Sequence, residues 1–144
     1  MPEGGGGIPI WIKDNGDYEG LEAVIDKDRT SVLLAVALDA DDILVVTSVP
    51  CLYINFGKPD QRALSEVGLE EVLAYQKEGQ FPPGSMGPKI EAAAAFLAKK
   101  GGTVIITDAA HLVQAVAGKA GTRIVHEKAS KPARIERTTA VRKS

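Results

Sequence analysis

Residues 84–107 read GSMGPKIEAAAAFLAKKGGTVIIT, and this stretch decides the fold class. A glycine-rich turn leads into a helical pattern whose apolar positions recur over residues 90–97, and the pattern ends at Gly101-Gly102. A continuous apolar run follows at 103–107, as in a parallel strand that is buried on both faces. Turn, helix, short connection and buried strand together predict an α/β fold.

The start of this helix carries an unusual charge. Pro88 suits the first helical position, where a missing N–H costs nothing. Lys89, however, places a cation near the positive end of the helix dipole, at a cost of up to about 1 kcal/mol. A bound anion would remove this cost, because the free N–H groups and the ammonium would all point at it. A phosphate site is one interpretation, and a surface lysine at an ordinary loop-to-helix junction is the other.

Asp26-Lys27-Asp28 repeat this arrangement at the start of a second expected helix, over residues 27–38. Asp26 is a good N-cap, and Lys27 again occupies the first helical position. Asp28 can accept a hydrogen bond from an ammonium group and fix its direction. Taken singly, Asp28 could instead complement the dipole while Lys27 remains a surface cation. A run typical of a buried parallel strand follows at 43–47, so the helix and strand pattern occurs twice.

The rest of the chain supplies further strands and helices separated by turns. His111 falls inside one of these helices and His126 lies near the C-terminus. Neither has a partner acid or nucleophile at a telling spacing, so we expect both to be structural or surface residues. The other expected elements are a polar turn at 13–20, an extended segment at 51–56, a helix at 67–77 capped by Ser65, a helix capped by Asp108 that ends before Gly118, and a strand at 122–125.

Composition limits the class of protein. The chain has 144 residues, of which 44% are hydrophobic and 25% charged, as expected for one globular domain. Cys51 is the only cysteine, which excludes an internal disulfide, and we expect no metal site made by the side chains. No apolar run approaches the length of a membrane span, so a cytoplasmic protein without a membrane partner is the simplest expectation.

Charge divides the chain into two parts. Residues 125–144 hold six of the 17 Lys and Arg residues and two of the 19 Asp and Glu residues, so this tail carries +4 and the remainder −6. The tail also lacks an apolar pattern that could form a core, and we expect it to be a flexible basic extension. The acidic remainder argues against a nucleic-acid-binding surface.

Six stretches, taken in order, resemble carbamate kinases of the amino acid kinase superfamily. The resemblance covers residues 4 to about 124 and corresponds to the C-terminal half of family members. It implies a three-layer α/β/α sandwich with a mostly parallel sheet, in which residues 1–124 form the half that binds the adenine nucleotide. The stretches are GGGGIPI at 4–10, EAVIDKD at 22–28, ADDILVVT at 40–47, LYINFGKPDQ at 52–61, EGQFPPGSMGPKIEAAAAF at 78–96 and TVIIT at 103–107.

The resemblance also implies an activity and roles for individual residues. The family reaction is reversible phosphoryl transfer, in which carbamoyl phosphate and ADP give ATP and carbamate, with Mg²⁺ held mainly through the nucleotide phosphates. Lys27 and Lys89 would neutralise the transferring phosphoryl group, and Asp28 would orient them. This agrees with the residues themselves, because phosphoryl transfer requires positioning and charge stabilisation. Tyr53, Asn55, Met86, Gly87 and Pro88 would surround the nucleotide, and Gly5, Gly6 and Gly7 would lie near the phosphoryl and carbamate oxygens.

The chain departs from the family pattern because it lacks the N-terminal half, including the GGN-type phosphate loop. Pro50 also stands where the family commonly has an acidic residue, and proline removes a backbone donor. We therefore expect a truncated kinase half whose partner is the missing half or a homo-oligomer. The alternative is a non-catalytic nucleotide-binding domain or remnant. Another acyl-phosphate-forming kinase is disfavoured, since GSMGPK and NFGKPDQ are characteristic of carbamate kinases.

Overall fold

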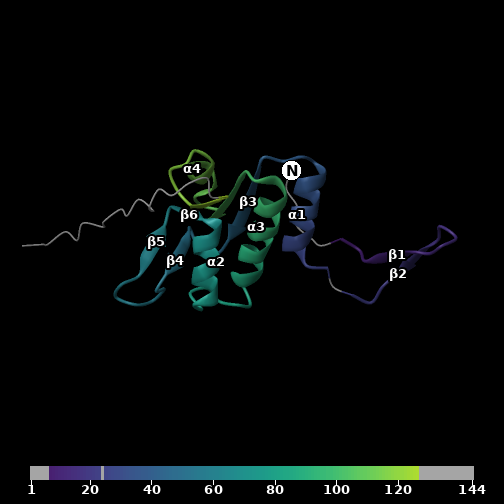
Figure 1. The fold of residues 1–144 in the computed structure, drawn as a ribbon, viewed down its shortest axis with the longest axis horizontal. Coiled ribbons are helices and arrows are strands. Elements are labelled where there is room, and N and C mark those ends of the chain that lie inside the picture. The colour runs from purple at the N-terminus through teal and green to yellow at the C-terminus, as the bar shows by residue number, and fades with distance from the viewer. Residues whose placement is uncertain (1–6, 24, 127–144) are drawn as a thin grey trace, which may run out of the picture.

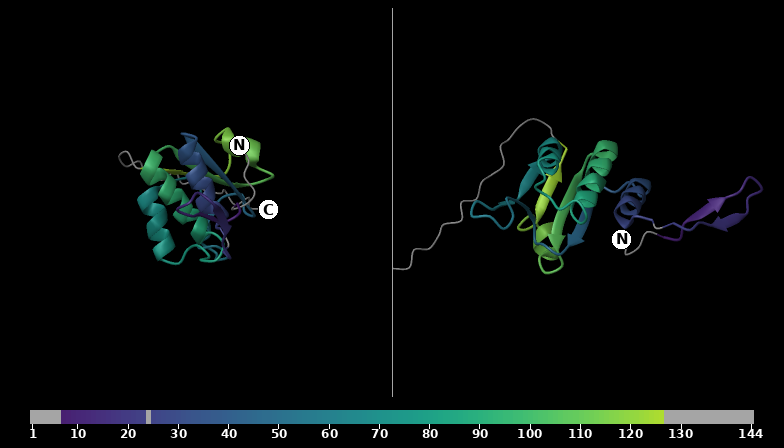
Figure 2. Two further views of the ribbon diagram at one scale, coloured as in Figure 1. Left: turned by 90° about the vertical axis from the view of Figure 1, so that its right-hand side faces the viewer. Right: turned by 90° about the horizontal axis from the view of Figure 1, so that it is seen from below.

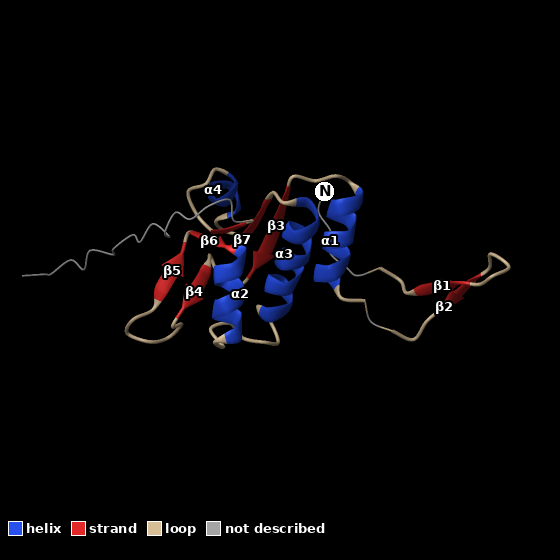
Figure 3. Ribbon diagram, in the orientation of Figure 1, coloured by secondary structure: helices blue, strands red, loops and turns tan. Residues whose placement is uncertain are grey.

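A computed structural model describes residues 7–23 and 25–126 of the chain, which fold into the helices and strands shown in Figures 1 and 3. The helices are α1 (Lys27–Ala37), α2 (Leu69–Lys77), α3 (Gly87–Lys100) and α4 (Leu112–Val116). The strands are β1 (Ile10–Ile12), β2 (Tyr18–Gly20), β3 (Asp42–Thr47), β4 (Leu52–Ile54), β5 (Arg62–Leu64), β6 (Glu66–Gly68), β7 (Thr103–Asp108) and β8 (Thr122–Val125).

Four strands form the central sheet, in the order β3, β7, β8, β6. β3 pairs in parallel with β7 along its whole length, from Asp42 opposite Thr103 to Thr47 opposite Asp108. β6 is parallel to β8, whereas β7 and β8 are antiparallel. The predicted α/β class with a mostly parallel sheet is therefore confirmed. β3 occupies one edge of this sheet, and that position matters for the site.

Helices cover the two faces of the sheet unequally. α1, α3 and α2 pack side by side on one face, while the short α4 lies against β7 on the other (Figures 1 and 2). The arrangement has the three layers that were predicted. The core lies between the sheet and the larger helical layer, where burial of each large apolar side chain contributes roughly 1.5–3 kcal/mol. Its completely or almost completely buried members include Ile90, Phe96, Leu97, Val104, Ile106 and Ile124.

The two strands predicted to be buried differ in their surroundings. In β7, Val104 and Ile106 are fully buried, and Ile105 on the opposite face is 5% exposed, so this strand is covered on both faces as expected. In β3, the residues from Ile43 to Val45 are only partly buried and Val46 is 50% exposed. The strand predicted to be buried at 43–47 is therefore buried less than expected. Within the described residues, β3 has a neighbouring strand on one side alone.

Local signals explain where the two long helices begin. The Asp26 side chain caps α1 by accepting hydrogen bonds from the N–H groups of Asp28 at 2.8 Å and Arg29 at 3.0 Å, which confirms the predicted N-cap. α3 begins at Gly87, so Pro88 is its second residue instead of its first. The two lysines are therefore in the first turns of their helices, as the sequence indicates.

The expected polar turn at 13–20 is instead part of a β-hairpin. β1 and β2 pair antiparallel, with Ile12 opposite Tyr18, and the hairpin extends away from the sheet (Figure 1). Asn15-Gly16 lies in the turn, which is closed by a 2.8 Å hydrogen bond from the Lys13 N–H to the Asp17 carbonyl. Asn-Gly between apolar strands is a strong hairpin signal, but both strands here are only three residues long.

Two further helix boundaries differ from the prediction. The helix expected at 67–77 begins at Leu69, because Glu66–Gly68 pair with β8 as strand β6. Gly68 is therefore the N-cap residue, and Ser65 does not cap this helix. Asp108 ends β7, and His111 is the N-cap residue of α4. In both places pairing within the sheet outweighs the local helix signal.

The predicted division of the chain falls close to the end of the sheet. β8 ends at Val125, one residue beyond the predicted boundary, and the described residues end at His126. The proposed tail therefore lies almost wholly outside the described residues. Among the helices of residues 7–23 and 25–126, none combines the length and the apolar character that crossing a membrane requires.

Gly101 and Gly102 provide a matched test of the junction between α3 and β7. Both have positive φ, but a Cβ on Gly102 would lie 1.9 Å from the Asp41 carbonyl oxygen, whereas one on Gly101 would meet nothing within 4 Å. Gly101→Ala should cost about 1–3 kcal/mol through backbone strain alone. Gly102→Ala should cost at least about 1 kcal/mol more, because strain and collision add. Urea denaturation measures both losses, and equal values would contradict the collision.

Candidate functional site

The two helix starts that carry lysines lie at the same end of the sheet. α1 precedes β3 and α3 precedes β7, and these strands are parallel neighbours. Both helices therefore begin near the carboxyl ends of the two strands (Figure 3). Ligands of open α/β sheets bind outside these ends. Two positive dipole ends thus converge on one place, although several of the first N–H groups already donate to Asp26 and Pro82.

Lys89 and Asp28 form an ion pair at this place, although 61 residues separate them in the sequence. The Lys89 Nζ lies 3.1 Å from Oδ2 and 3.4 Å from Oδ1 of Asp28. Their side chains are 13% and 16% exposed, so solvent screens the pair only partly. Asp28 therefore supplies a negative charge that offsets the unfavourable position of Lys89 at the start of α3.

Lys27 adds a second positive charge to this cluster. It is the first residue of α1 and is exposed, and it lines the same cavity as Asp28 and Lys89. The neighbouring Asp26 is engaged as the N-cap, and the pKa of its carboxyl lies below the ordinary value chiefly because the Arg29 N–H donates to it. Lys27 and Arg29 both lower the pKa of Asp26 by their charge, so the three cations Lys27, Arg29 and Lys89 outnumber the carboxylates of Asp26 and Asp28. The arrangement favours an anion.

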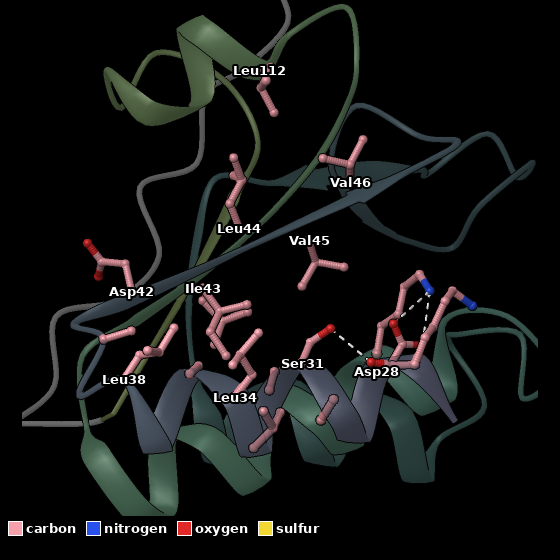
Figure 4. Close-up of a pocket in the computed structure, with 18 residues that line it drawn as sticks. Asp28, Ser31, Leu34, Leu38, Asp42, Ile43, Leu44, Val45, Val46 and Leu112 are labelled. Carbon is pink, nitrogen blue, oxygen red and sulfur yellow. Dashed lines mark hydrogen bonds and ion pairs between the residues drawn. The ribbon is translucent and has the colours of Figure 1, made fainter. Parts of the chain in front are cut away.

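The cluster stands at one end of a cavity of about 610 Å³ between α1 and β3, which we call the α1–β3 groove. Figure 4 shows Ile43 and Val45 pointing from β3 toward α1, and Leu44 and Val46 pointing to the opposite face. Asp42 lies at the far end from Asp28 in the same view. The groove is therefore apolar along its length, and the two lysines give its Asp28 end a positive charge.

A second cavity, of about 510 Å³, opens beside β4, and we call it the β4 pocket. Tyr53, Asn55 and Met86 line it, as three of the five residues predicted to surround a nucleotide. Gly87 and Pro88 begin α3 and do not line the pocket. Other lining residues carry no local signal in the sequence, because the folding of two loops around β4 brings them together. They include Cys51, Phe56, Lys58, Gln80 and Phe81.

Asn55 shapes the wall of the β4 pocket. It adopts φ +54°, a conformation in which Asn is more common than most residues. Its N–H donates to Gln80 Oε1 at 2.8 Å, and its side-chain Nδ2 donates to Asp60 Oδ2 at 2.7 Å. Gln80 Nε2 donates back to Asn55 Oδ1 at 3.3 Å. The Asn55 side chain therefore holds two loops together.

Tyr53 and Cys51 interact on another wall of this pocket. The neighbouring Cys51 side chain is the main reason that the pKa of Tyr53 is raised to about 12. Burial raises the pKa of the Cys51 thiol. The Tyr53 ring also packs against Phe56, with ring centroids 5.7 Å apart. The pocket thus offers two aromatic rings and an un-ionised phenol at neutral pH.

The glycines predicted to form a substrate loop are only partly described. Gly5 and Gly6 lie outside the described residues. Gly7 is exposed with φ +82° and lines neither cavity. The structure therefore does not bring Gly7 together with Lys27 or Lys89.

The expectation that His111 has no partner acid is wrong. Its Nδ1 lies 2.6 Å from Asp108 Oδ1, and its backbone N–H donates to the same oxygen at 2.9 Å. The imidazole contact lowers the pKa of Asp108. The three-residue spacing from Asp108 to His111 is the sequence signal for this contact. Within the part of the chain that the structure describes, no cluster of three or more His, Cys, Asp or Glu residues could hold a metal ion.

Comparison with known proteins relates this geometry to a family. Residues 6–108 match the family model described as the amino acid kinase family. Carbamate kinase 3 of Staphylococcus aureus is 52% identical over 122 residues, which cover 84% of this chain and 39% of the relative. Carbamate kinase-like protein YahI of Escherichia coli is 48% identical, with coverage of 85% and 39%. The chain thus spans about two-fifths of the length of the curated relatives it matches.

Solved structures show the same similarity. Carbamate kinase from Giardia lamblia bound to AMP-PNP superimposes with a TM-score of 0.78 at 44% identity, over 85% of this chain and 42% of that chain. An N-acetylglutamate synthase from Neisseria gonorrhoeae gives a TM-score of 0.57 at 21% identity, over 79% of this chain and 26% of that chain. The second similarity concerns the fold alone.

The effect of Cys51 on Tyr53 predicts a change in titration. Cys51→Ala should lower the pKa of Tyr53 from about 12 toward the ordinary value of 10, because the side chain that contributes most to the raised value is removed. Alkaline titration followed by tyrosinate absorbance measures this pKa, with Tyr53→Phe to assign the transition and circular dichroism to check that the protein stays folded. A Tyr53 pKa that remains near 12 in Cys51→Ala would contradict the assignment.

Proposed function

Because the chain belongs to the amino acid kinase family, we propose that it is the nucleotide-binding part of a carbamate kinase-like phosphotransferase. Residues 1–124 would form this part, and residues 125–144 a basic extension. The reaction would be reversible phosphoryl transfer between carbamoyl phosphate with ADP and carbamate with ATP. The observation that carries the proposal is the cluster of Lys27, Asp28 and Lys89 at two adjoining helix starts.

The cluster suits the chemistry of phosphoryl transfer. This reaction demands charge stabilisation and in-line positioning more than a covalent intermediate. Lys27 and Lys89 would contact oxygens of the transferring phosphoryl group, where positive charge matters most in the transition state. Asp28 would act as a positioning residue, since it holds the Lys89 ammonium by its pair of contacts.

The β4 pocket would hold the adenine nucleotide. Its volume of about 510 Å³ falls within the range of small-molecule sites. Tyr53 and Met86 offer apolar surfaces for a base, and the start of α3 at Gly87 and Pro88 leads from the pocket toward Lys89. The similarity to a carbamate kinase bound to AMP-PNP supports this placement. Mg²⁺ would come with the nucleotide, because it usually retains water and phosphate ligands.

A non-catalytic nucleotide-binding domain is the second candidate. It is favoured by the β4 pocket, which the residues of this chain form by themselves and which nucleotide binding alone would use. Calorimetry with ADP and Mg²⁺, together with a coupled assay of ATP formation from carbamoyl phosphate, separates the two. Binding with turnover supports the kinase, and binding without turnover supports the second candidate. If the chain binds no nucleotide, both are wrong for this chain.

Lys89→Ala should reduce turnover at least about tenfold in an assembly that forms ATP, equivalent to about 1.4 kcal/mol. The physical reason is the loss of a positive charge that acts on the transferring phosphoryl group. Lys99→Ala is the control, because Lys99 is exposed in the last turn of the same helix. Steady-state assays of both variants measure the difference. Unchanged turnover in Lys89→Ala would remove this residue from the mechanism.

Tyr53→Ala should weaken ADP binding about 3- to 10-fold, because the loss of one aromatic contact is worth about 0.5–1.5 kcal/mol. Tyr18→Ala is the matched control, since Tyr18 lies on the hairpin and is 71% exposed. Calorimetry gives both dissociation constants. Equal effects of the two substitutions would show that the β4 pocket does not hold the nucleotide.

A further inference from the structure

The β1–β2 hairpin exposes a cluster of large apolar side chains. Ile10 is 50% exposed, Trp11 and Ile12 are each 58% exposed, and Tyr18 is 71% exposed. The hairpin extends away from the sheet, and among the described residues β1 and β2 pair only with each other (Figures 1 and 2). Two short strands alone are at best marginally stable in water. A further strand would therefore cover these side chains and stabilise the hairpin.

The hydrogen bonds of the hairpin show which backbone groups remain free. Two bonds flank the strands, from the Lys13 N–H to the Asp17 carbonyl at 2.8 Å and from the Leu21 N–H to the Pro9 carbonyl at 3.0 Å. Bonded and non-bonded pairs alternate in an antiparallel ladder, so Trp11 and Glu19 form the bonded pair between them. The N–H and carbonyl groups of Ile10 and Ile12 therefore point away from β2 and are available to another strand.

A second copy of β1 matches this free edge. Antiparallel pairing about a two-fold axis beside Trp11 places Trp11 opposite Trp11 of the second copy. The same register places Ile10 opposite Ile12 of the second copy, and the outward N–H and carbonyl groups of these residues then bond to each other. Aromatic and β-branched side chains are favourable partners across strands. All three residues of β1 are thus matched by their own counterparts.

The outer edge of β2 is a poorer site for self-pairing. A two-fold axis beside Glu19 would place two carboxylates directly opposite each other, and like charges in that position are destabilising. β1 contains no charged residue. Charge therefore selects the edge of β1 and protects the edge of β2.

The charge of the hairpin also argues against other partners. Residues 13–22 contain one Lys and four Asp or Glu residues. This acidic character disfavours an anionic lipid surface and nucleic acid. A second copy needs no opposite charge, because its contacts along β1 are apolar side chains and backbone hydrogen bonds.

We propose that β1 pairs with β1 of a second copy of this chain, so that two hairpins form one four-stranded antiparallel sheet in a symmetric dimer. Such an interface uses the same surface on both copies and closes at two. The proposal goes beyond the proposed function, because no residue of 7–23 lines the α1–β3 groove or the β4 pocket. Both cavities stay open in the dimer.

Sedimentation of the full 144-residue chain tests for the dimer. Each copy contributes only three strand residues, so we expect a weak association with a dissociation constant on the order of 100 µM. Trp11 is the only tryptophan, and its fluorescence should shift to shorter wavelength as the dimer forms. Amide exchange at Ile10 and Ile12 should slow as the protein concentration rises. A chain that remains monomeric at about 1 mM would overturn the proposal.

Two proline variants locate the edge that pairs. Ile12→Pro removes an outward N–H of β1, which a hairpin tolerates because that N–H takes no part in the β1–β2 ladder. It should weaken the dimer about tenfold or more. Tyr18→Pro is the matched control, since Tyr18 pairs with Ile12 and its N–H points to the outer edge of β2. Equal weakening by both variants would overturn the assignment to β1.

Charged variants test the two-fold axis at Trp11. Trp11→Lys and Trp11→Glu chains should each fail to form a dimer, because like charges would lie opposite each other. A mixture of the two should form a heterodimer that neither chain forms alone. Loss of association in the mixture as well would contradict this register.

Val46→Lys is the control for another strand edge, since Val46 is 50% exposed on β3. It should leave the dimer unchanged, and self-association that only Val46→Lys abolishes would overturn the proposal. ADP binding separates the dimer from the proposed function. Ile12→Pro should bind ADP as the unaltered chain does, because both cavities lie outside the hairpin. A dimer that binds no nucleotide would support this proposal and count against the proposed function.

Discussion

The parallel pairing of β3 with β7 is the constraint on which the site depends. Each strand is preceded by a helix that returns along the sheet, so parallel strands place the two helix starts at one end. Lys89 and Asp28 are 61 residues apart in sequence, and this pairing brings them to 3.1 Å. With antiparallel strands, the same two helices would begin at opposite ends. The chemistry of the cluster is thus a consequence of sheet topology.

The ion pair changes how the lysines are interpreted. From the sequence, a bound anion that offsets the dipole is one interpretation of Lys89, and a surface lysine is the other. The structure supplies a carboxylate, Asp28, so the position of Lys89 is explained without a ligand. The indication of an anion is then the charge of the whole cluster, in which Lys27, Arg29 and Lys89 outnumber the carboxylates of Asp26 and Asp28. The proposed phosphate site rests on the cluster as a whole.

Much of the fold could be predicted because its signals are local. The cap at Asp26, the end of α3 at Gly101-Gly102 and the apolar run of β7 each involve adjacent residues. The misses required contacts between distant segments. β6 exists because β8 pairs with it, and the contact between Asp28 and Lys89 exists because of sheet order. For the site, the sequence showed which residues carry charge, but it did not show which of them contact one another.

β3 and β7 show why one kind of pattern can end in different environments. Both strands are continuous apolar runs, and both are predicted to be buried. The prediction holds for β7, which lies between two strands, and it fails for Val46 of β3, which is 50% exposed. An apolar run therefore indicates that a strand needs neighbours to cover it. The described residues provide this cover for β7 but only part of it for β3. The partly uncovered surfaces of β3 and α1 adjoin each other and lead to the lysine cluster. Covering these surfaces and completing the site are therefore one structural requirement.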